Sequence, residues 1–239
     1  MIPKLYDELA EWWPLMCDPQ SYRRAARTYS ELIREAGPVR SVLELGSGGG
    51  SAACFLKEDF ELTLVDPAPR MLEVSAKANP ECRHVCADMR NVRLDASFDA
   101  VLIEDAIGYM TTRGDLLEAI ITASAHCVRG GVCLFLPDSF RETYAPGAIC
   151  GGRDDGQRGL RYLEWRHESS PSGTTCETDF ALLLRHETGV VEAVYDRHTC
   201  GLFRRNDWAE LCRAAGLSPC FRELSGDDTP SEAIVCKKP

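Results

Sequence analysis

The chain lacks the features that place a protein in a membrane, in an export pathway or on nucleic acid. It has no apolar run of 18 residues that could cross a bilayer. Its N-terminus lacks the apolar core of a signal peptide, so we expect a cytoplasmic protein. Basic side chains are scattered, and 27 Lys and Arg against 37 Asp and Glu give a net charge of −10. Because nucleic-acid affinity depends on phosphate contacts from a basic face, we expect neither a nucleic-acid nor a membrane partner.

The chain has 12 cysteines but no C-x-x-C pair. Cys54, Cys133 and Cys236 lie in apolar segments, which is typical of cysteines that pack as small apolar residues. The segment 82–86 holds two cysteines and a histidine, but it lacks a second ligand pair at the spacing of a zinc site. We therefore expect neither a metal centre nor a framework of disulfides.

A glycine-rich turn follows an apolar run at residues 42–50, which read Val-Leu-Glu-Leu-Gly-Ser-Gly-Gly-Gly. Gly46 and Gly48 let the backbone turn sharply and approach a ligand where a Cβ atom would clash. Glu44 precedes the first glycine and would repel a pyrophosphate but attract a cation. Ser51 stands where a dinucleotide fingerprint has its third glycine. This pattern favours S-adenosylmethionine (SAM), which carries a sulfonium and an ammonium and no phosphate.

Further landmarks follow in order along the chain. Asp66 ends the next predicted strand, 20 residues after Gly46, where an acid in a nucleotide-binding βαβ unit accepts hydrogen bonds from both ribose hydroxyls. Asp88 and Met89 follow a short strand, and Glu104 ends a longer one. These positions lie at the carboxyl ends of successive strands, where open α/β sheets bind their ligands.

In this order the landmarks resemble the class I SAM-dependent methyltransferase family, strongly over residues 37–138. The turn 128–132 matches a family motif except that Arg129 replaces the usual proline. The resemblance implies that Asp88 accepts from the adenine amino group and that Met89 packs on the adenine ring. The residues that we expect to bind SAM are Tyr22, Glu44, Gly46, Gly48, Asp66, Pro67, Met71, Asp88, Met89 and Glu104.

The alternation of strands and helices up to residue 138 predicts an α/β fold with a parallel sheet covered by helices on both faces. With the family's closing strands it becomes a Rossmann-like, seven-stranded, mostly parallel sheet. We expect helices at 4–16 and 19–36, a loop at 145–159 and three antiparallel strands at 160–167, 174–186 and 190–200. The predicted domains are an N-terminal helical cap at 1–36, a SAM-binding core at 37–138 and 203–239, and an antiparallel insert at 139–202 that forms a substrate lid.

Methyl transfer is an in-line displacement, in which the enzyme holds the nucleophile about 3 Å from the methyl carbon. A general base matters only when the nucleophile arrives protonated. Asp105 and Tyr109 follow a strand end, and segment 104–109 resembles that of amino-sugar N-methyltransferases, in which a polar aromatic residue faces the substrate amine. Alternatively, Tyr109 packs under the cap and Asp105 lies in a solvated loop. Asp138 after the fifth strand either faces substrate or caps the next turn.

Two further candidates come from the flanks of the core. Tyr6 and Asp7 match a Tyr-Asp pair that folds over the methionine end of SAM in these relatives, and Tyr22 matches a tyrosine near the SAM carboxylate. His198 in the insert titrates near neutral pH, although it could equally be a satisfied histidine within a sheet. We expect one pocket to be lined by Tyr6, Asp105, Tyr109 and at least one of Arg161, Trp165 and His198.

The sequence thus predicts a SAM-dependent methyltransferase that acts on a nitrogen or oxygen of a small-molecule acceptor. The other interpretation is a non-catalytic SAM- or dinucleotide-binding protein, such as a partner subunit. An exposed edge of the insert could pair two chains, so a homodimer is possible.

Overall fold

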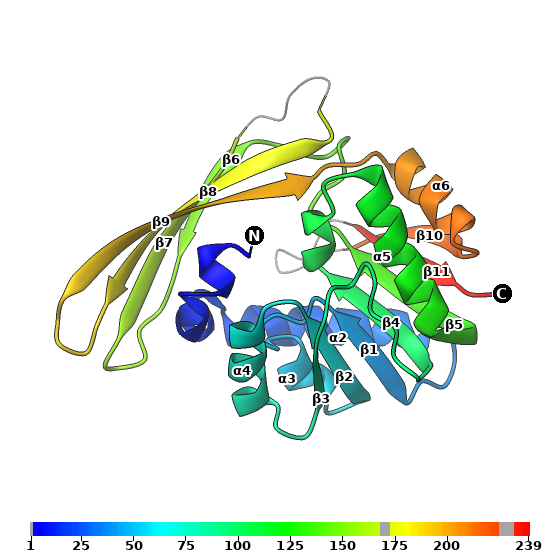
Figure 1. Cartoon of the computed structure of the whole chain (residues 1–239), viewed down its shortest axis with the longest axis horizontal. Helices are drawn as coiled ribbons and strands as arrows, with labels where there is room; N and C mark the ends of the chain where they lie inside the picture. Colours follow the sequence, from blue (N-terminus) through cyan, green and yellow to red (C-terminus); the bar gives the residue numbers. More distant parts are fainter. Residues whose placement is uncertain (1, 168–172, 225–231) are drawn as a thin grey trace.

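The computed structural model describes residues 2–167, 173–224 and 232–239 and contains two sheets. The larger sheet has seven strands in the order β10-β11-β5-β4-β1-β2-β3, of which β10 and β11 run antiparallel to their neighbours (Figure 1). This architecture confirms the predicted fold class. Its strands are β1 (Ser41–Leu45), β2 (Glu61–Asp66), β3 (Arg83–Cys86), β4 (Phe98–Glu104), β5 (Cys127–Leu136), β10 (Ser218–Glu223) and β11 (Glu232–Lys237).

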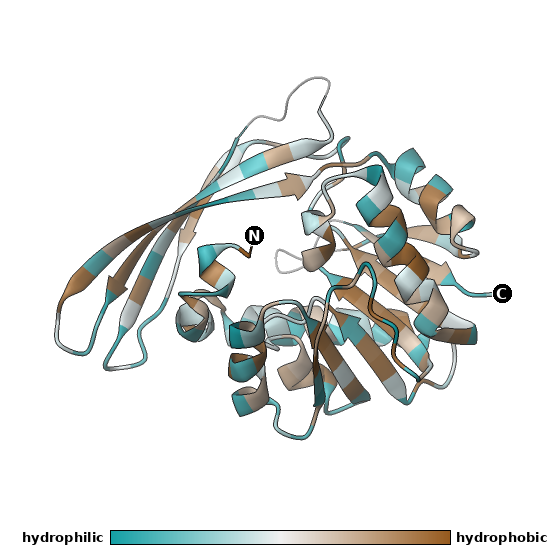
Figure 2. Cartoon of the chain, viewed as in Figure 1, coloured by the Kyte–Doolittle hydropathy of each residue, from teal (hydrophilic) through white to brown (hydrophobic). Residues whose placement is uncertain are grey.

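Helices cover both faces of this sheet, because its strands are apolar on both sides (Figure 2). On one face, Leu43 and Phe135 pack with side chains of α5 (Arg113–His126) and α6 (Arg205–Ala214), including Trp208. On the other face, Leu64 packs with α2 (Pro19–Arg34) and α3 (Ala53–Leu56), including Tyr29. Helix α4 (Pro69–Ala78) lies beside β2 and β3. No helix in the described parts of the chain is long and apolar enough to span a membrane.

The second sheet is antiparallel and follows β5 in the chain, in the order β6-β7-β8-β9. Strands β7 (Gly159–Arg166), β8 (Thr175–Arg185) and β9 (Val191–Gly201) match the three predicted runs, and Gly189 forms the turn with φ of 83°. Strand β6 (Gly147–Gly151) lies where the sequence predicted only a loop. That prediction was wrong because glycine content does not prevent pairing at a sheet edge, and a Cβ atom at Gly151 would lie 2.8 Å from the Tyr162 ring.

The N-terminal segment packs against the inner face of the second sheet, where Leu5, Leu9 and Trp12 form a cluster with Phe180 and Leu182. The predicted helix 4–16 was wrong. Instead, η1 (Lys4–Tyr6) and η2 (Ala10–Trp12) are short 3₁₀ turns, and α1 (Trp13–Met16) is a single α-helical turn. Pro14 has no N–H group to donate within a continuous helix, and it is tolerated only in the first turn of α1. The segment thus follows the sheet more closely than a straight helix would.

Candidate active site at the strand ends

The glycine turn after β1 is crowded on one side and open on the other. Gly46, Gly48 and Gly50 all have positive φ values, which favour glycine. A Cβ atom at Gly46 would lie 2.3 Å from Ala106 Cβ, so this position has no room for a side chain. At Gly48 the nearest atom is Met71 Cε at 3.4 Å. Gly46 is therefore needed for packing, whereas Gly48 faces free space at the strand ends.

Two polar groups beside this turn lack partners within the described structure. Glu44 is 3% exposed and its Oε2 atom has no hydrogen-bond partner, and the same is true of Ser47 Oγ. Burial, together with the charges of Glu104 and Asp66, raises the pKa of Glu44 well above its usual value. A buried carboxyl group without a partner is costly. A cationic ligand beside Glu44 would remove that cost, so the residues present fit SAM.

Asp66 lies at the end of β2 and is held by backbone donors. Its two carboxylate oxygens accept hydrogen bonds from the N–H groups of Gly48 and Ala68, each at 2.8 Å. Burial raises its pKa, while these two bonds act in the opposite direction. A carboxylate keeps further lone pairs beyond these two bonds, so Asp66 can still accept from a ligand. Of the two residues expected to follow it in the site, Met71 is fully buried and Pro67 is exposed.

The next predicted pair is already engaged with protein groups. Asp88 accepts hydrogen bonds from the guanidinium of Arg90 at 2.6 and 3.1 Å, and the same arginine also contacts Asp115. These bonds hold the pKa of Asp88 below its usual value. Met89 is buried, and its Cε atom would lie 2.8 Å from a Cβ atom at Gly46. Met89 thus lies next to the glycine turn, where a ring bound at the strand ends could contact it.

Glu104, at the end of β4, has a partner that the sequence analysis missed. The Tyr29 hydroxyl on α2 donates to its Oε1 atom at 2.6 Å. Burial raises the pKa of Glu104 to about 7, with the Tyr29 bond opposing and the charge of Asp138 adding to the shift. The sequence analysis gave Tyr29 no role. The available signal for this contact was a tyrosine among the apolar residues of a predicted helix, because a buried hydroxyl needs a hydrogen-bond partner.

Tyr22 lies near the same end of the sheet. It helps to line a cavity of about 530 Å³ beside the glycine turn, together with Trp13, Gly49 and Ser51. The Trp13 indole N–H donates to Ser51 Oγ at 3.1 Å, so the N-terminal segment lies directly on the turn. Burial raises the pKa of Tyr22 well above its usual value. Its position fits a tyrosine close to one end of the cofactor.

Asp105 and Asp138, which follow β4 and β5, form a carboxyl pair. Asp105 has φ of 40°, an uncommon conformation for a residue other than glycine. Desolvation raises the pKa of Asp105 well above its usual value, and the charge of Asp138 adds to this shift. Desolvation also raises the pKa of Asp138, while the hydrogen bond from Asp105 opposes the shift. Both residues keep solvent-exposed surface despite this desolvation.

A continuous chain of hydrogen bonds joins three segments that lie far apart in the sequence. The hydroxyls of Tyr6 and Tyr109 are 2.8 Å apart. The Tyr109 hydroxyl is 2.7 Å from His198 Nδ1, and His198 Nε2 is 3.1 Å from Asp196 Oδ2. His198 is 3% exposed, on the inner face of β9. The structure therefore brings together Tyr6, Tyr109 and His198, and neither tyrosine hydroxyl is isolated in a dry core.

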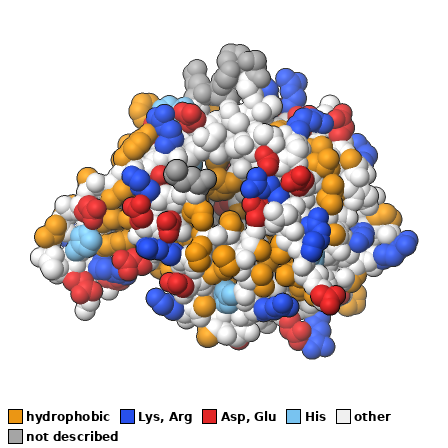
Figure 3. Space-filling view, viewed as in Figure 1, with side chains coloured by type: hydrophobic (Ala, Val, Ile, Leu, Met, Phe, Trp, Pro, Cys, Tyr) orange, Lys and Arg blue, Asp and Glu red, His pale blue; other side chains and the backbone are white. Residues whose placement is uncertain are grey.

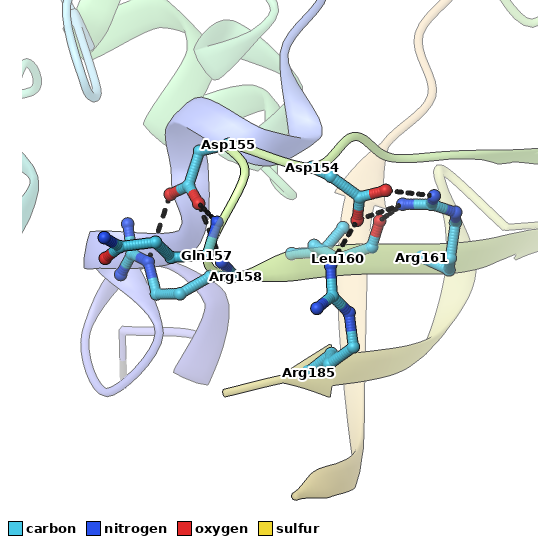
Figure 4. A network of polar contacts seen from close by, with 7 residues as sticks. All are labelled: Asp154, Asp155, Gln157, Arg158, Leu160, Arg161 and Arg185. Atoms are coloured by element: carbon cyan, nitrogen blue, oxygen red, sulfur yellow. Dashed lines mark hydrogen bonds and ion pairs between the residues drawn. The ribbon is translucent and has the colours of Figure 1, made fainter. Parts of the chain in front are cut away.

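Two other candidates of the insert lie outside this group. Arg161 is exposed and pairs with Asp154, which also contacts Arg185 (Figure 4). Trp165 is 54% exposed and stacks on His167, with ring centroids 4.9 Å apart. Residues 161 and 165 share one side of β7, and that side faces solvent. Of the three insert candidates, the structure therefore places only His198 beside Tyr6 and Tyr109. On the face seen in Figure 3, acidic and basic side chains are interspersed.

Comparison with known proteins finds similarity to methyltransferases. A methyltransferase domain model matches residues 42–131. The dTDP-3-amino-3,4,6-trideoxy-alpha-D-glucopyranose N,N-dimethyltransferase of Streptomyces venezuelae is 27% identical over 208 residues, which cover 83% of this chain and 84% of that protein.

Two solved structures share the fold. Streptomyces venezuelae DesVI has a TM-score of 0.82 at 24% identity, covering 91% of this chain and 92% of that one. A SAM-bound amino pentose methyltransferase from Micromonospora echinaspora has a TM-score of 0.78 at 22% identity, with the same two coverages. Residues 42–131 thus match a methyltransferase domain, and the chain is similar to methyltransferases and shares the fold of a SAM-bound one. These findings support the enzyme and not the non-catalytic interpretation.

Proposed function

We propose that this enzyme transfers the methyl group of SAM to the amino nitrogen of a small-molecule acceptor. The observation that carries the proposal is the set of groups around the acceptor side. The hydroxyls of Tyr6 and Tyr109 and the carboxyl groups of Asp105 and Asp138 gather at the ends of β4 and β5. An amine arrives as an ammonium, and such a set attracts the cation and can take its proton.

SAM supplies an electrophilic methyl group on a sulfonium, so the protein mainly has to bind, orient and exclude water. On the donor side, we propose that Glu44 and Glu104 face the cationic end of SAM and that Asp66 binds the ribose. Tyr22 would lie near the carboxylate, while Asp88 and Met89 would contact the adenine. On the acceptor side, Tyr6 and Tyr109 would orient the nitrogen, and Asp105 would hold or accept its proton.

The name of the Streptomyces venezuelae relative describes methylation of an amino sugar, which supports an amine acceptor. The insert and the N-terminal segment would roof the acceptor as a lid. The remaining predictions from sequence, which are a cytoplasmic location, no nucleic-acid or membrane partner and a possible homodimer, stay predictions.

The experiment is a methylation assay with purified protein, SAM and dTDP-3-amino-3,4,6-trideoxy-α-D-glucopyranose, followed by mass spectrometry. A matched compound with a hydroxyl in place of the amine serves as the control. We expect one or two methyl groups on the amine and none on the hydroxyl compound. Methylation of the hydroxyl compound alone would contradict the proposal.

A further inference from the structure

The buried carboxylate of Asp196 lies beside His198, and the groups that contact it are hydrogen-bond donors. Asp196 is 7% exposed and lies two residues before His198 on the inner face of β9. Its Oδ2 atom accepts the Leu5 N–H at 2.9 Å and is 3.1 Å from His198 Nε2. Its Oδ1 atom accepts the Arg197 N–H at 3.1 Å. Because an ionised carboxylate only accepts, Nε2 of His198 must carry a proton and donate it.

This requirement fixes the direction of the hydrogen bonds that join His198 to Tyr109 and Tyr109 to Tyr6. A neutral imidazole has one donor and one acceptor nitrogen, so Nδ1 of His198 accepts from the Tyr109 hydroxyl at 2.7 Å. Tyr109 has then used its single proton, so its oxygen accepts from the Tyr6 hydroxyl at 2.8 Å. Tyr6 therefore donates to Tyr109, Tyr109 donates to His198, and His198 donates to Asp196. The oxygen of Tyr6 is left with only lone pairs for a ligand.

The surroundings of His198 keep this order in place. Burial lowers the pKa of His198, with Asp196 opposing the shift, which favours the neutral ring. The Phe180 and Tyr6 rings lie 4.7 and 5.4 Å from the imidazole, between centroids. Asp196 also holds the backbone of Leu5, the residue before Tyr6. One carboxylate therefore orients both ends of the hydrogen-bond chain.

We propose that Asp196 is a positioning residue for methyl transfer, which acts through His198 to make the tyrosine hydroxyls accept the proton of the acceptor amine. The proposal rests on the proposed function. The lone pair of the nitrogen forms the new N–C bond, and sulfur keeps the electron pair of the broken C–S bond. The resulting ammonium passes a proton to the Tyr6 oxygen, Tyr6 passes its own to Tyr109, and Tyr109 passes its own to Nδ1 of His198. The imidazolium that forms is paired with Asp196.

The first test is the tautomer of His198, which needs no acceptor. Long-range proton–nitrogen NMR on the protein with S-adenosylhomocysteine can resolve its signals, because the chain has five histidines and His198→Gln identifies the right one. We expect a neutral ring with Nε2 protonated at pH about 7.5. A ring protonated at Nδ1 alone, or a charged ring at that pH, would overturn the proposal.

The second test is Asp196→Asn, with Asp179→Asn as the matched control. Asp179 lies on the same sheet but binds the exposed Arg197 and Tyr195. Its replacement therefore removes a carboxylate without removing a member of the hydrogen-bond chain from Tyr6 to Asp196. We expect Asp196→Asn to lower kcat on the amino-sugar probe by about tenfold or more, less than the ~10²–10⁴ of a direct acid–base group. Affinity for S-adenosylhomocysteine should not change, and the control should keep the kcat of the parent.

The pH dependence of kcat distinguishes this role of Asp196 from a general loss of structure. The titratable groups that face His198 are Asp196, Tyr109 and Tyr6. Removing the charge of Asp196 destabilises the imidazolium, so the pKa of His198 read by NMR and the acid limb of kcat should both move to lower pH. Glu104 and Asp105 also have raised pKa values, so their titration would also affect kcat. The NMR titration of His198 identifies which part of the pH profile of kcat belongs to His198.

The outcomes distinguish the two proposals. If the parent methylates the amine and Asp196→Asn does so equally well with an unshifted limb, the role of Asp196 is wrong and the proposed function stands. If the parent does not methylate the amine probe, the proposed function fails for that probe, and the tautomer of His198 alone decides whether the order of donation is correct.

Discussion

The donor side and the acceptor side that we propose for this site are built in different ways. The donor side uses residues at the ends of neighbouring parallel strands, with Glu44, Asp66 and Glu104 at or near the ends of β1, β2 and β4. The acceptor side joins Tyr6, Tyr109 and His198, and its hydrogen bonds span 103 and 89 residues. The donor side therefore depends on one sheet, whereas the acceptor side depends on how two sheets and the N-terminal segment are placed together.

The largest expected effect comes from breaking the packing under the donor side. Gly46→Ala places a methyl group 2.3 Å from Ala106 Cβ and 2.8 Å from Met89 Cε, at a φ of 79°. Overpacking costs about 1–3 kcal/mol and the left-handed conformation about 1–2 kcal/mol more. We expect a marked loss of stability in thermal or urea unfolding without any ligand.

Gly48→Ala is the matched control, since its new methyl group meets only Met71 Cε at 3.4 Å. It should lose less stability than Gly46→Ala and should mainly weaken SAM binding. Equal destabilisation by both substitutions would contradict the distinction between a packing glycine and a ligand-facing glycine.

The next effect concerns the proposed ribose contact. Asp66→Ala removes a carboxylate whose hydrogen bonds to a ligand are worth about 1.5–3 kcal/mol, so SAM should bind roughly tenfold more weakly or worse. Calorimetry on the folded variant measures this. Since Asp66 also accepts from Gly48 and Ala68, Asp66→Asn, which keeps an acceptor oxygen, should lose less. Unchanged SAM affinity in the alanine variant would remove Asp66 from the donor side.

A smaller effect is expected on the acceptor side from Tyr109→Phe. The ring stays, but the hydroxyl that links Tyr6 to His198 is lost. Turnover on the amino-sugar probe should fall by about tenfold, a loss of about 1.4 kcal/mol of transition-state stabilisation, while SAM affinity is retained. Trp165→Ala is the control, because Trp165 lies on the outer face of β7. A loss of SAM affinity that equals the loss of turnover would show that Tyr109 serves the donor side.

The smallest effect is a pH dependence of ligand stabilisation. Burial raises the pKa of Glu104 to about 7, above its value in an unfolded chain, so its contribution to stability is present at low pH and is lost as the pH rises through about 7. A nearby cation favours the ionised carboxylate. The increase in Tm caused by SAM should therefore be larger at pH about 8 than at pH about 6. S-adenosylhomocysteine lacks the sulfonium and should show a weaker dependence, and equal dependence for both ligands would contradict a contact between the sulfonium and this carboxylate.

The residues of the proposed donor side could be nominated from the sequence because they follow a local pattern. A strand, a glycine turn and an acid after each following strand occur at fixed spacing, and parallel strands bring their carboxyl ends to one edge. The same local rules failed where tertiary packing decided. Apolar spacing predicted one helix over 4–16, but Pro14 and the facing sheet give three short turns instead. The glycine content of residues 145–159 predicted a loop, but residues 147–151 form β6 because they pair with β7.

On the acceptor side the sequence predicted one shared pocket, but not which side chains in it form hydrogen bonds with one another. Alternation within β7 and β9 allows either face to point inward, so Arg161, Trp165 and His198 were equal candidates until the sheet was placed. Tyr29 and Asp196 carried no motif at all, and their partners lie 75 and 191 residues away in the chain.

The sequence by itself determined the fold class and nominated the cofactor and the residues of the proposed donor side, because these depend on short-range patterns of strand, turn and charge. Only the tertiary structure decided which side of the insert faces the core, which hydroxyls meet and which carboxylate stands behind the histidine. Those contacts are made between segments whose separation in the chain carries no information about their distance in space.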